Sequence, residues 1–62
     1  MKYVVISEKG EVKEFSESHE VDVFLTKSDG VYYIVNIYGN YVYVDKYAVV
    51  NGKIHLVDSV TL

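Results

Sequence analysis

The sequence predicts an α+β fold with the element order ββαβββ, in which residues 1–62 form a single domain. Three features of the sequence predict this fold. The second half of the chain holds three runs of β-branched and aromatic residues separated by two-residue turn signals, and residues 2–15 hold two shorter runs around a three-residue loop. Between them, residues 16–30 have apolar side chains at helical spacing. We therefore expect a hairpin, a short helix and a three-stranded meander.

The meander is predicted from residues 31–62. Its three runs are separated by Gly39-Asn40 and Asn51-Gly52. Both dipeptides supply the positive φ angles that two-residue hairpin turns require, and Asn-Gly is the strongest such signal. The runs are rich in Val, Ile and Tyr, which fit a pleated surface better than a helix.

These turns also predict which residues face each other, because side chains alternate along a strand. A two-residue loop at Gly39-Asn40 places Tyr38 opposite Tyr41 and Tyr32 opposite Tyr47. One face then carries small apolar residues and is the expected core face, to be covered by the helix: Val31, Tyr33, Val35, Ile37, Val42, Val44, Ala48 and Val50. The other face carries most of the tyrosines, with apolar residues of the last strand: Tyr32, Ile34, Tyr38, Tyr41, Tyr43, Tyr47, Val49, Ile54, Leu56, Val60 and Leu62.

An uninterrupted last hairpin would pair two acidic residues. Its register sets Asp45 opposite Asp58, and like charges facing each other are unfavourable. We therefore expect a bulge, a bend or a register change near Asp45 and Lys46, where the strand could also curl toward a barrel.

Residues 2–15 predict the first hairpin. Lys2–Ser7 is one strand, residues 8–10 fit a three-residue loop with Gly10 at the left-handed position, and residues 11–15 form the returning strand. This loop sets Ile6 opposite Val12 and Tyr3 opposite Phe15.

Residues 16–30 fit a helix or a strand. Val21, Phe24, Leu25 and Ser28 have helical spacing, with Ser18 as a candidate cap and Gly30 as a candidate terminator. However, Val21, Val23 and Leu25 also alternate as in a strand. The helix gives the ββαβββ fold, and the strand gives the alternative, an all-β six-stranded small barrel.

Composition restricts the partners. The net charge is −3 and there is no Arg, which argues against nucleic acid because neutralising phosphates supplies most of that affinity. No stretch approaches the ~20 apolar residues of a membrane span, and residues 1–6 do not resemble a signal peptide, so we expect a cytoplasmic protein.

A chain this short and without Cys has few ways to stabilise itself, and small proteins of this kind often oligomerise. A homodimer is the expected state.

Acidic residues gather in one part of the chain. Residues 8–22 hold six acidic residues and two lysines, so this segment carries −4 while the rest carries +1. The segment is a candidate acidic patch for a partner with a basic surface; its residues are Glu8, Glu11, Glu14, Glu17, Glu20 and Asp22.

Catalytic chemistry is not indicated. A Ser59, His55 and Asp58 arrangement lacks any context that would orient it, and neither His19 with Glu20 nor His55 with Asp58 has the spacing of a metal site. All four Gly residues are assigned to turns, so there is no phosphate-binding loop. We expect no enzyme activity, no cofactor and no metal.

The tyrosine-rich face is the main candidate for function. Tyr is enriched at protein interfaces, and the predicted interaction face comprises Tyr32, Ile34, Tyr38, Tyr41, Tyr43 and Tyr47. Core residues of a barrel are the structural alternative for these tyrosines, and a stacking platform for single-stranded nucleic acid is the functional one. Small size, acidity and the lack of recognisable chemistry favour an interaction protein of the kind that viruses and mobile elements use to block a host factor.

Overall fold

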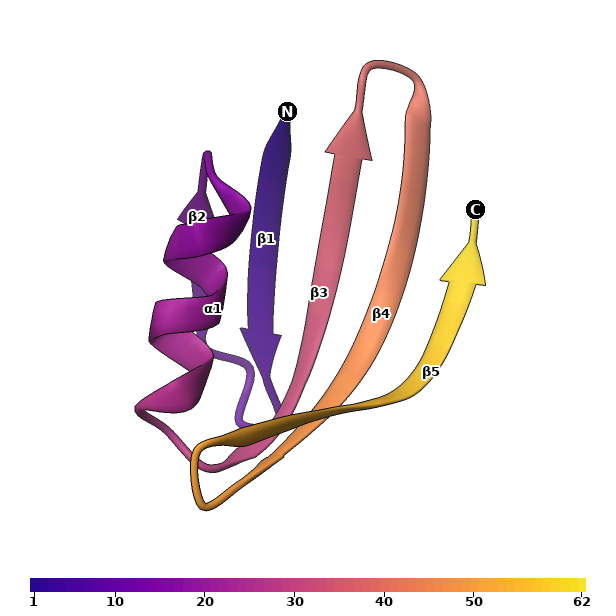
Figure 1. Cartoon of the computed structure of the whole chain (residues 1–62). Coiled ribbons are helices and arrows are strands. Elements are labelled where there is room, and N and C mark those ends of the chain that lie inside the picture. The colour runs from indigo at the N-terminus through magenta and orange to yellow at the C-terminus, as the bar shows by residue number, and fades with distance from the viewer.

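The second half of the chain folds as three long antiparallel strands, β3 (Gly30–Tyr38), β4 (Tyr41–Val50) and β5 (Lys53–Thr61). The computed structural model describes residues 1–62, and Figure 1 shows the strands beside one another. Both predicted turns are present, and Asn51, Gly39 and Gly52 have positive φ angles of 52°, 60° and 75°. The predicted pairing of β3 with β4 is confirmed from Tyr38 opposite Tyr41 to Tyr32 opposite Tyr47.

The first hairpin consists of β1 (Lys2–Ser7) and β2 (Val12–Phe15). Its predicted register is confirmed, with Tyr3 opposite Phe15 and Ile6 opposite Val12. Gly10 has a φ of 86°, the left-handed conformation that the loop requires.

A single helix, α1 (Ser18–Thr26), links the hairpin to the meander. Val21 and Leu25 are buried and Phe24 packs against the core, as their spacing predicts. The predicted ends differ from the structure: Glu17, not Ser18, occupies the N-cap position and forms no side-chain capping bond. Lys27 is the C-cap, and Gly30, with a φ of 146°, begins β3.

The strands form one antiparallel sheet in the order β2-β1-β3-β4-β5. Strand β1 lies between β2 and β3 and is antiparallel to both, so β2 and β3 run parallel and α1 is the crossover between them. With the helix toward the viewer, β3 lies to the right of β2 (Figure 1), the right-handed sense that such crossovers take in about 98% of cases. The six-stranded barrel alternative needs a sixth strand in residues 16–30, where the structure has a helix.

A register shift occurs between Lys46 and Tyr47, where a bulge or register change was predicted. Val57 is the extra residue, because Leu56 pairs with Tyr47 and Asp58 pairs with Lys46. The shift replaces the unfavourable Asp45–Asp58 pair with Lys46 opposite Asp58. Asp45 then faces Ser59, whose Oγ donates a hydrogen bond of 2.7 Å to its carboxylate.

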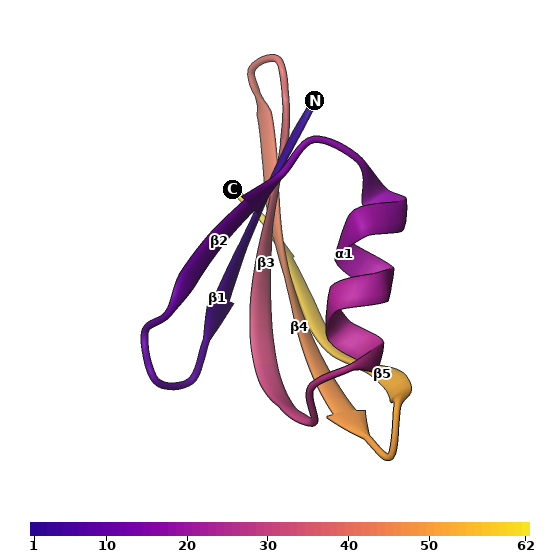
Figure 2. The same ribbon diagram turned by 90° about the vertical axis from the view of Figure 1, so that its left-hand side faces the viewer.

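The core lies between α1 and the tyrosine-bearing face of the sheet. This corrects the prediction that the opposite face, from Val31 to Val50, is the core face. Figure 2 shows α1 on one side of the sheet and no other element on the other side. The face was decided by the right-handed crossover of α1 and by the pairing of β1 with β3, neither of which follows from patterns within the meander. The buried apolar side chains are Tyr3, Val5, Val21, Leu25, Tyr32, Ile34 and Val49.

Candidate interaction surfaces

The helix divides the six residues of the predicted interaction face. Tyr32 and Ile34 are buried beneath it, with 7% and 4% of their surface exposed, and half-buried Tyr47 packs against the same core. Tyr38, Tyr41 and Tyr43 lie nearer the turn between β3 and β4. The structure therefore places half of the set in or against the core and half beyond it.

The three outer tyrosines pack against one another, because the short helix α1 does not extend over them. Nine residues make a helix about 13 Å long, while the ten residues of β4 extend about 33 Å. The Tyr38 and Tyr43 rings stack at 5.8 Å with an interplanar angle of 9°, and Tyr41 packs against Tyr43 at 5.8 Å. The Tyr3 and Tyr38 hydroxyls lie 3.3 Å apart, and this hydrogen bond, followed by burial, raises the pKa of Tyr3.

The opposite face of the sheet, called here the bare face, is uncovered and mostly apolar. Its centre is a row of four valines that face one another across β1, β3, β4 and β5: Val4, Val35, Val44 and Val60. Further apolar residues surround this row on the same side of the sheet: Ile6, Val12, Val31, Tyr33, Ile37, Val42, Ala48 and Val50. The sequence predicts that most of these residues share one apolar face, but it assigns that face to the core.

The bulge in β5 extends the bare face. Without it, Val60 and Leu62 would lie on the tyrosine-bearing face, where the sequence predicts them and where the structure has the helix. The shift pairs Val60 with Val44, and the Leu62 amide donates to the Val42 carbonyl at 2.9 Å. Both side chains therefore lie on the bare face, where Val60 is 50% and Leu62 77% exposed.

The two sides of the molecule differ in charge. The cross-strand pairs place three lysines and two acidic residues on the bare face, a balance of +1: Lys2, Lys46, Lys53, Glu14 and Asp58. The Lys2 Nζ forms an ion pair with the Glu14 Oε1 at 2.6 Å. The Lys46 Nζ lies 5.6 Å from the centre of the Tyr33 ring. The helix, its flanking loops and the helix side of the sheet carry two lysines and five acidic residues, a balance of −3.

The six residues of the predicted acidic patch are spread over the molecule. Glu8 and Glu11 lie at the loop between β1 and β2, and Glu14 lies on the bare face in its ion pair with Lys2. The remaining three belong to the helix region: Glu17, Glu20 and Asp22. The structure thus does not gather the six residues into one patch.

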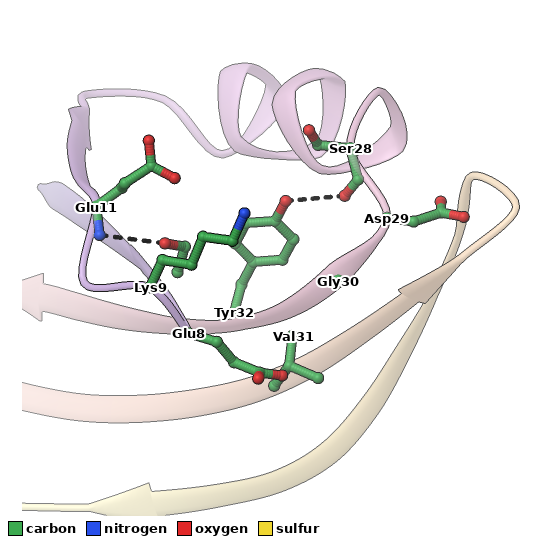
Figure 3. Close-up of a pocket in the computed structure, with 9 residues that line it drawn as sticks. Glu8, Lys9, Glu11, Ser28, Asp29, Gly30, Val31 and Tyr32 are labelled. Atoms are coloured by element: carbon green, nitrogen blue, oxygen red, sulfur yellow. Dashed lines mark hydrogen bonds between the residues drawn. The ribbon is translucent and has the colours of Figure 1, made fainter.

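A cavity of about 320 Å³ lies between the β1–β2 loop and the segment that joins α1 to β3 (Figure 3). The Tyr32 hydroxyl crosses it to donate a hydrogen bond of 2.9 Å to the Ser28 carbonyl. Asp29 points away from the cavity and accepts hydrogen bonds from the Asn51 and Gly52 amides at 2.9 and 3.2 Å. The hydrogen bonds around this cavity therefore stabilise the loops that surround it.

A smaller, half-open cleft of about 110 Å³ lies between α1 and the sheet. Its base is apolar and includes Val21, Leu25 and Ile34, while carboxylates of Asp22 and Asp45 line it from the helix and from β4. Burial raises the pKa of the Tyr47 hydroxyl, and the nearby charges of Asp45 and Asp22 raise it further. No local sequence pattern indicates this cleft, because its lining residues lie far apart in the chain.

The serine, histidine and aspartate considered for catalysis are not arranged as a triad. Ser59 lies on the helix side, bonded to Asp45, whereas Asp58 faces Lys46 on the bare face. His55 lies opposite Ala48, as predicted. No three His, Asp or Glu side chains gather where they could hold a metal ion.

Comparison with known proteins gives no relative: no family model, curated protein or solved structure matches the chain. The only helix, with nine residues, lacks the length and apolar character of a membrane-spanning segment.

Proposed function

We propose that this chain is a non-enzymatic protein interaction module whose bare face binds a second copy of itself. The observation that carries the proposal is the unequal coverage of the sheet: α1 covers one face, while the row of Val4, Val35, Val44 and Val60 on the other has no cover. Single-layer antiparallel sheets normally present polar residues to water, and large exposed apolar patches on proteins usually mark contact surfaces.

The size of the bare face suits a small dimer. Four strands about 4.8 Å apart and about seven residues long give roughly 450 Å² per copy, or about 900 Å² for two copies. That total lies close to the lower bound of about 1,000 Å² for a specific interface. Only 8 of 62 residues are buried in the single chain, so a second copy would add substantially to a small core.

Charge favours a second copy as the occupant. The bare face has a balance of +1, distributed as mixed lysines and acidic residues, so two such faces can meet with little repulsion. The helix sides, at −3 each, would point outward. In such an isologous contact each copy uses the same surface, so the assembly is complete at two copies.

The sheet edges, in contrast, are protected against strand addition. Edge strand β2 has only four residues, including Lys13 and Glu14, and the other edge strand, β5, has a bulge at Val57. Short, charged and bulged edges are the usual devices against edge pairing. Packing of the two bare faces is therefore favoured over extension of the sheet.

Sedimentation equilibrium over a range of protein concentrations tests the proposal. We expect a monomer–dimer equilibrium, which Val44→Lys weakens by about a hundredfold or more because it buries an unpaired charge in each copy. Val44→Thr, which keeps a β-branched side chain, should weaken the dimer less. Thr61→Lys is the matched control, because Thr61 pairs with Tyr43 on the helix side.

Two results would contradict the proposal. A monomer at all concentrations would leave the bare face without its proposed occupant, and equal weakening by Thr61→Lys would place the contact elsewhere. If tyrosine fluorescence of a monomer also fell on adding a single-stranded oligonucleotide, less so at high salt, the alternative of a nucleic-acid platform would replace it. A cytoplasmic location and a role in blocking a host factor stay predictions from the sequence.

A further inference from the structure

The cleft between α1 and the sheet lies on the side of the molecule that the proposed dimer leaves free. Val21 and Leu25 of α1 and Ile34 of β3 form an apolar base together with Ile54 of β5. Its volume of about 110 Å³ is well below the ~300 to 1,000 Å³ of pockets for small molecules. A cleft of this size admits a single side chain from a partner.

The polar lining of the cleft is acidic. Asp22 of α1 forms no hydrogen bond or ion pair, so its carboxylate is free for a ligand. Asp45 of β4 accepts hydrogen bonds from the Asn36 amide at 3.1 Å and from the Ser59 hydroxyl at 2.7 Å, which fix its position. No lysine lines the cleft to neutralise the two carboxylates.

An amphipathic cation matches this lining. A methylene chain can lie on the apolar base while its charged end stays near the carboxylates, which is how long basic side chains divide their contacts. The aromatic ring of Tyr47, which also lines the cleft, adds a surface that attracts cations.

Lysine fits better than arginine. A guanidinium group gains most from two parallel hydrogen bonds to one carboxylate. Both oxygens of Asp45 already accept hydrogen bonds, so this pairing is hindered there, whereas a compact ammonium group does not need two parallel bonds to one carboxylate.

We propose that this cleft binds a lysine side chain presented by a protein partner, with Asp22 and Asp45 receiving the ammonium group and Val21, Leu25 and Ile34 receiving the methylene chain. This goes beyond self-association, since the cleft and the bare face lie on opposite sides of the sheet. A dimer through the bare face would carry two such clefts facing outward.

NMR titration of the ¹⁵N-labelled protein tests this site at low salt. The probe is a five-residue peptide, blocked at both ends, with one lysine between glycines. We expect saturable chemical-shift changes centred on the amides of Asp22, Asp45 and Tyr47. The same peptide with norleucine in place of lysine, which keeps the methylene chain and loses the charge, should give far smaller changes.

Asp22→Asn should weaken binding of the lysine peptide about threefold to fivefold, the range for a partly exposed ion pair. Glu8→Gln is the matched control, because it removes the same charge from the distant β1–β2 loop and should change affinity less than twofold. Spectra of both variants without peptide check that the fold is retained.

Three results would overturn the proposal: no saturable shifts at the cleft, equal shifts with the norleucine peptide, or equal weakening by Asp22→Asn and Glu8→Gln. Butylamine binding as tightly as the peptide would instead indicate a site for small amines. None of these results depends on the dimer, which sedimentation measures separately.

Discussion

The two faces of this sheet are built from alternate residues of the same strands, yet only one of them forms the core. The helix side carries large rings whose hydroxyls find partners, such as Tyr3 with Tyr38 and Tyr32 with Ser28. The bare face carries valines and isoleucines that make a low, regular surface. Bulky tyrosines fill the irregular space between a helix and a sheet, whereas β-branched side chains suit the ≈ 10 Å spacing of two packed sheets.

The largest expected effect is the loss of stability when a core side chain beneath the helix is truncated. Leu25 is 1% exposed, so Leu25→Ala should cost about 2–5 kcal/mol, most of the ~3–9 kcal/mol available to a 62-residue domain. Urea unfolding followed by circular dichroism should show a midpoint at a much lower urea concentration than that of the parent chain. A stability close to that of the parent chain would contradict this account of the core.

Val44→Ala on the bare face provides the contrast. At concentrations where the chain is monomeric, it should cost about 1 kcal/mol or less, because no element packs on Val44. The cost should grow with protein concentration as the dimer forms. A cost independent of concentration would mean that this face is not an interface.

A smaller effect is expected from the polar network that only the helix side contains. Asn36 is 5% exposed, and its side-chain amide donates to Asp45 and to the Ile34 carbonyl at 3.1 and 3.2 Å. Asn36→Ala removes the donor of both hydrogen bonds and should cost about 1–3 kcal/mol. Ser59→Ala, which removes an exposed bond to the same carboxylate, should cost less. Equal losses in urea unfolding would argue against a buried network.

The smallest effect is a dependence of stability on alkaline pH. The fold raises the pKa of Tyr3, through its hydrogen bond with Tyr38 and through burial, and raises that of Tyr47, mainly through burial. Above pH 10, the unfolded chain therefore binds fewer protons than the folded chain, and stability must fall as pH rises. Urea midpoints at pH 9 and pH 11 should differ less in a Tyr3→Phe, Tyr47→Phe variant. An unchanged pH dependence in that variant would contradict the assignment.

Local chemistry allowed much of the fold to be predicted. The glycines of the turns and Asn51 have the positive φ angles that hairpin turns use, and these turns set the registers of the first hairpin and of β3 with β4. Repulsion between Asp45 and Asp58 located the register shift in β5. Each of these signals lies within a few residues or across one turn.

The covered face could not be predicted from the same signals, because both faces of the meander are apolar. The choice depends on β1 pairing with β3, which makes β2, α1 and β3 a crossover of fixed hand. The cleft with Asp22 and Asp45 was missed for a similar reason, since α1 and β4 meet only in the folded chain. The bulge moved Val60 and Leu62 to the bare face, which the predicted location of the shift did not by itself reveal.

Isotope-filtered NOE spectroscopy tests the central claim most directly. An equal mixture of ¹³C-labelled and unlabelled chains, at a concentration where sedimentation shows a dimer, reports only contacts between copies. The account predicts intermolecular contacts among the methyl groups of Val35, Ile37 and Val44, and none from Val21 or Leu25. Intermolecular contacts confined to the outer tyrosines or to the edge of β5, or no such contacts at millimolar concentration, would contradict it.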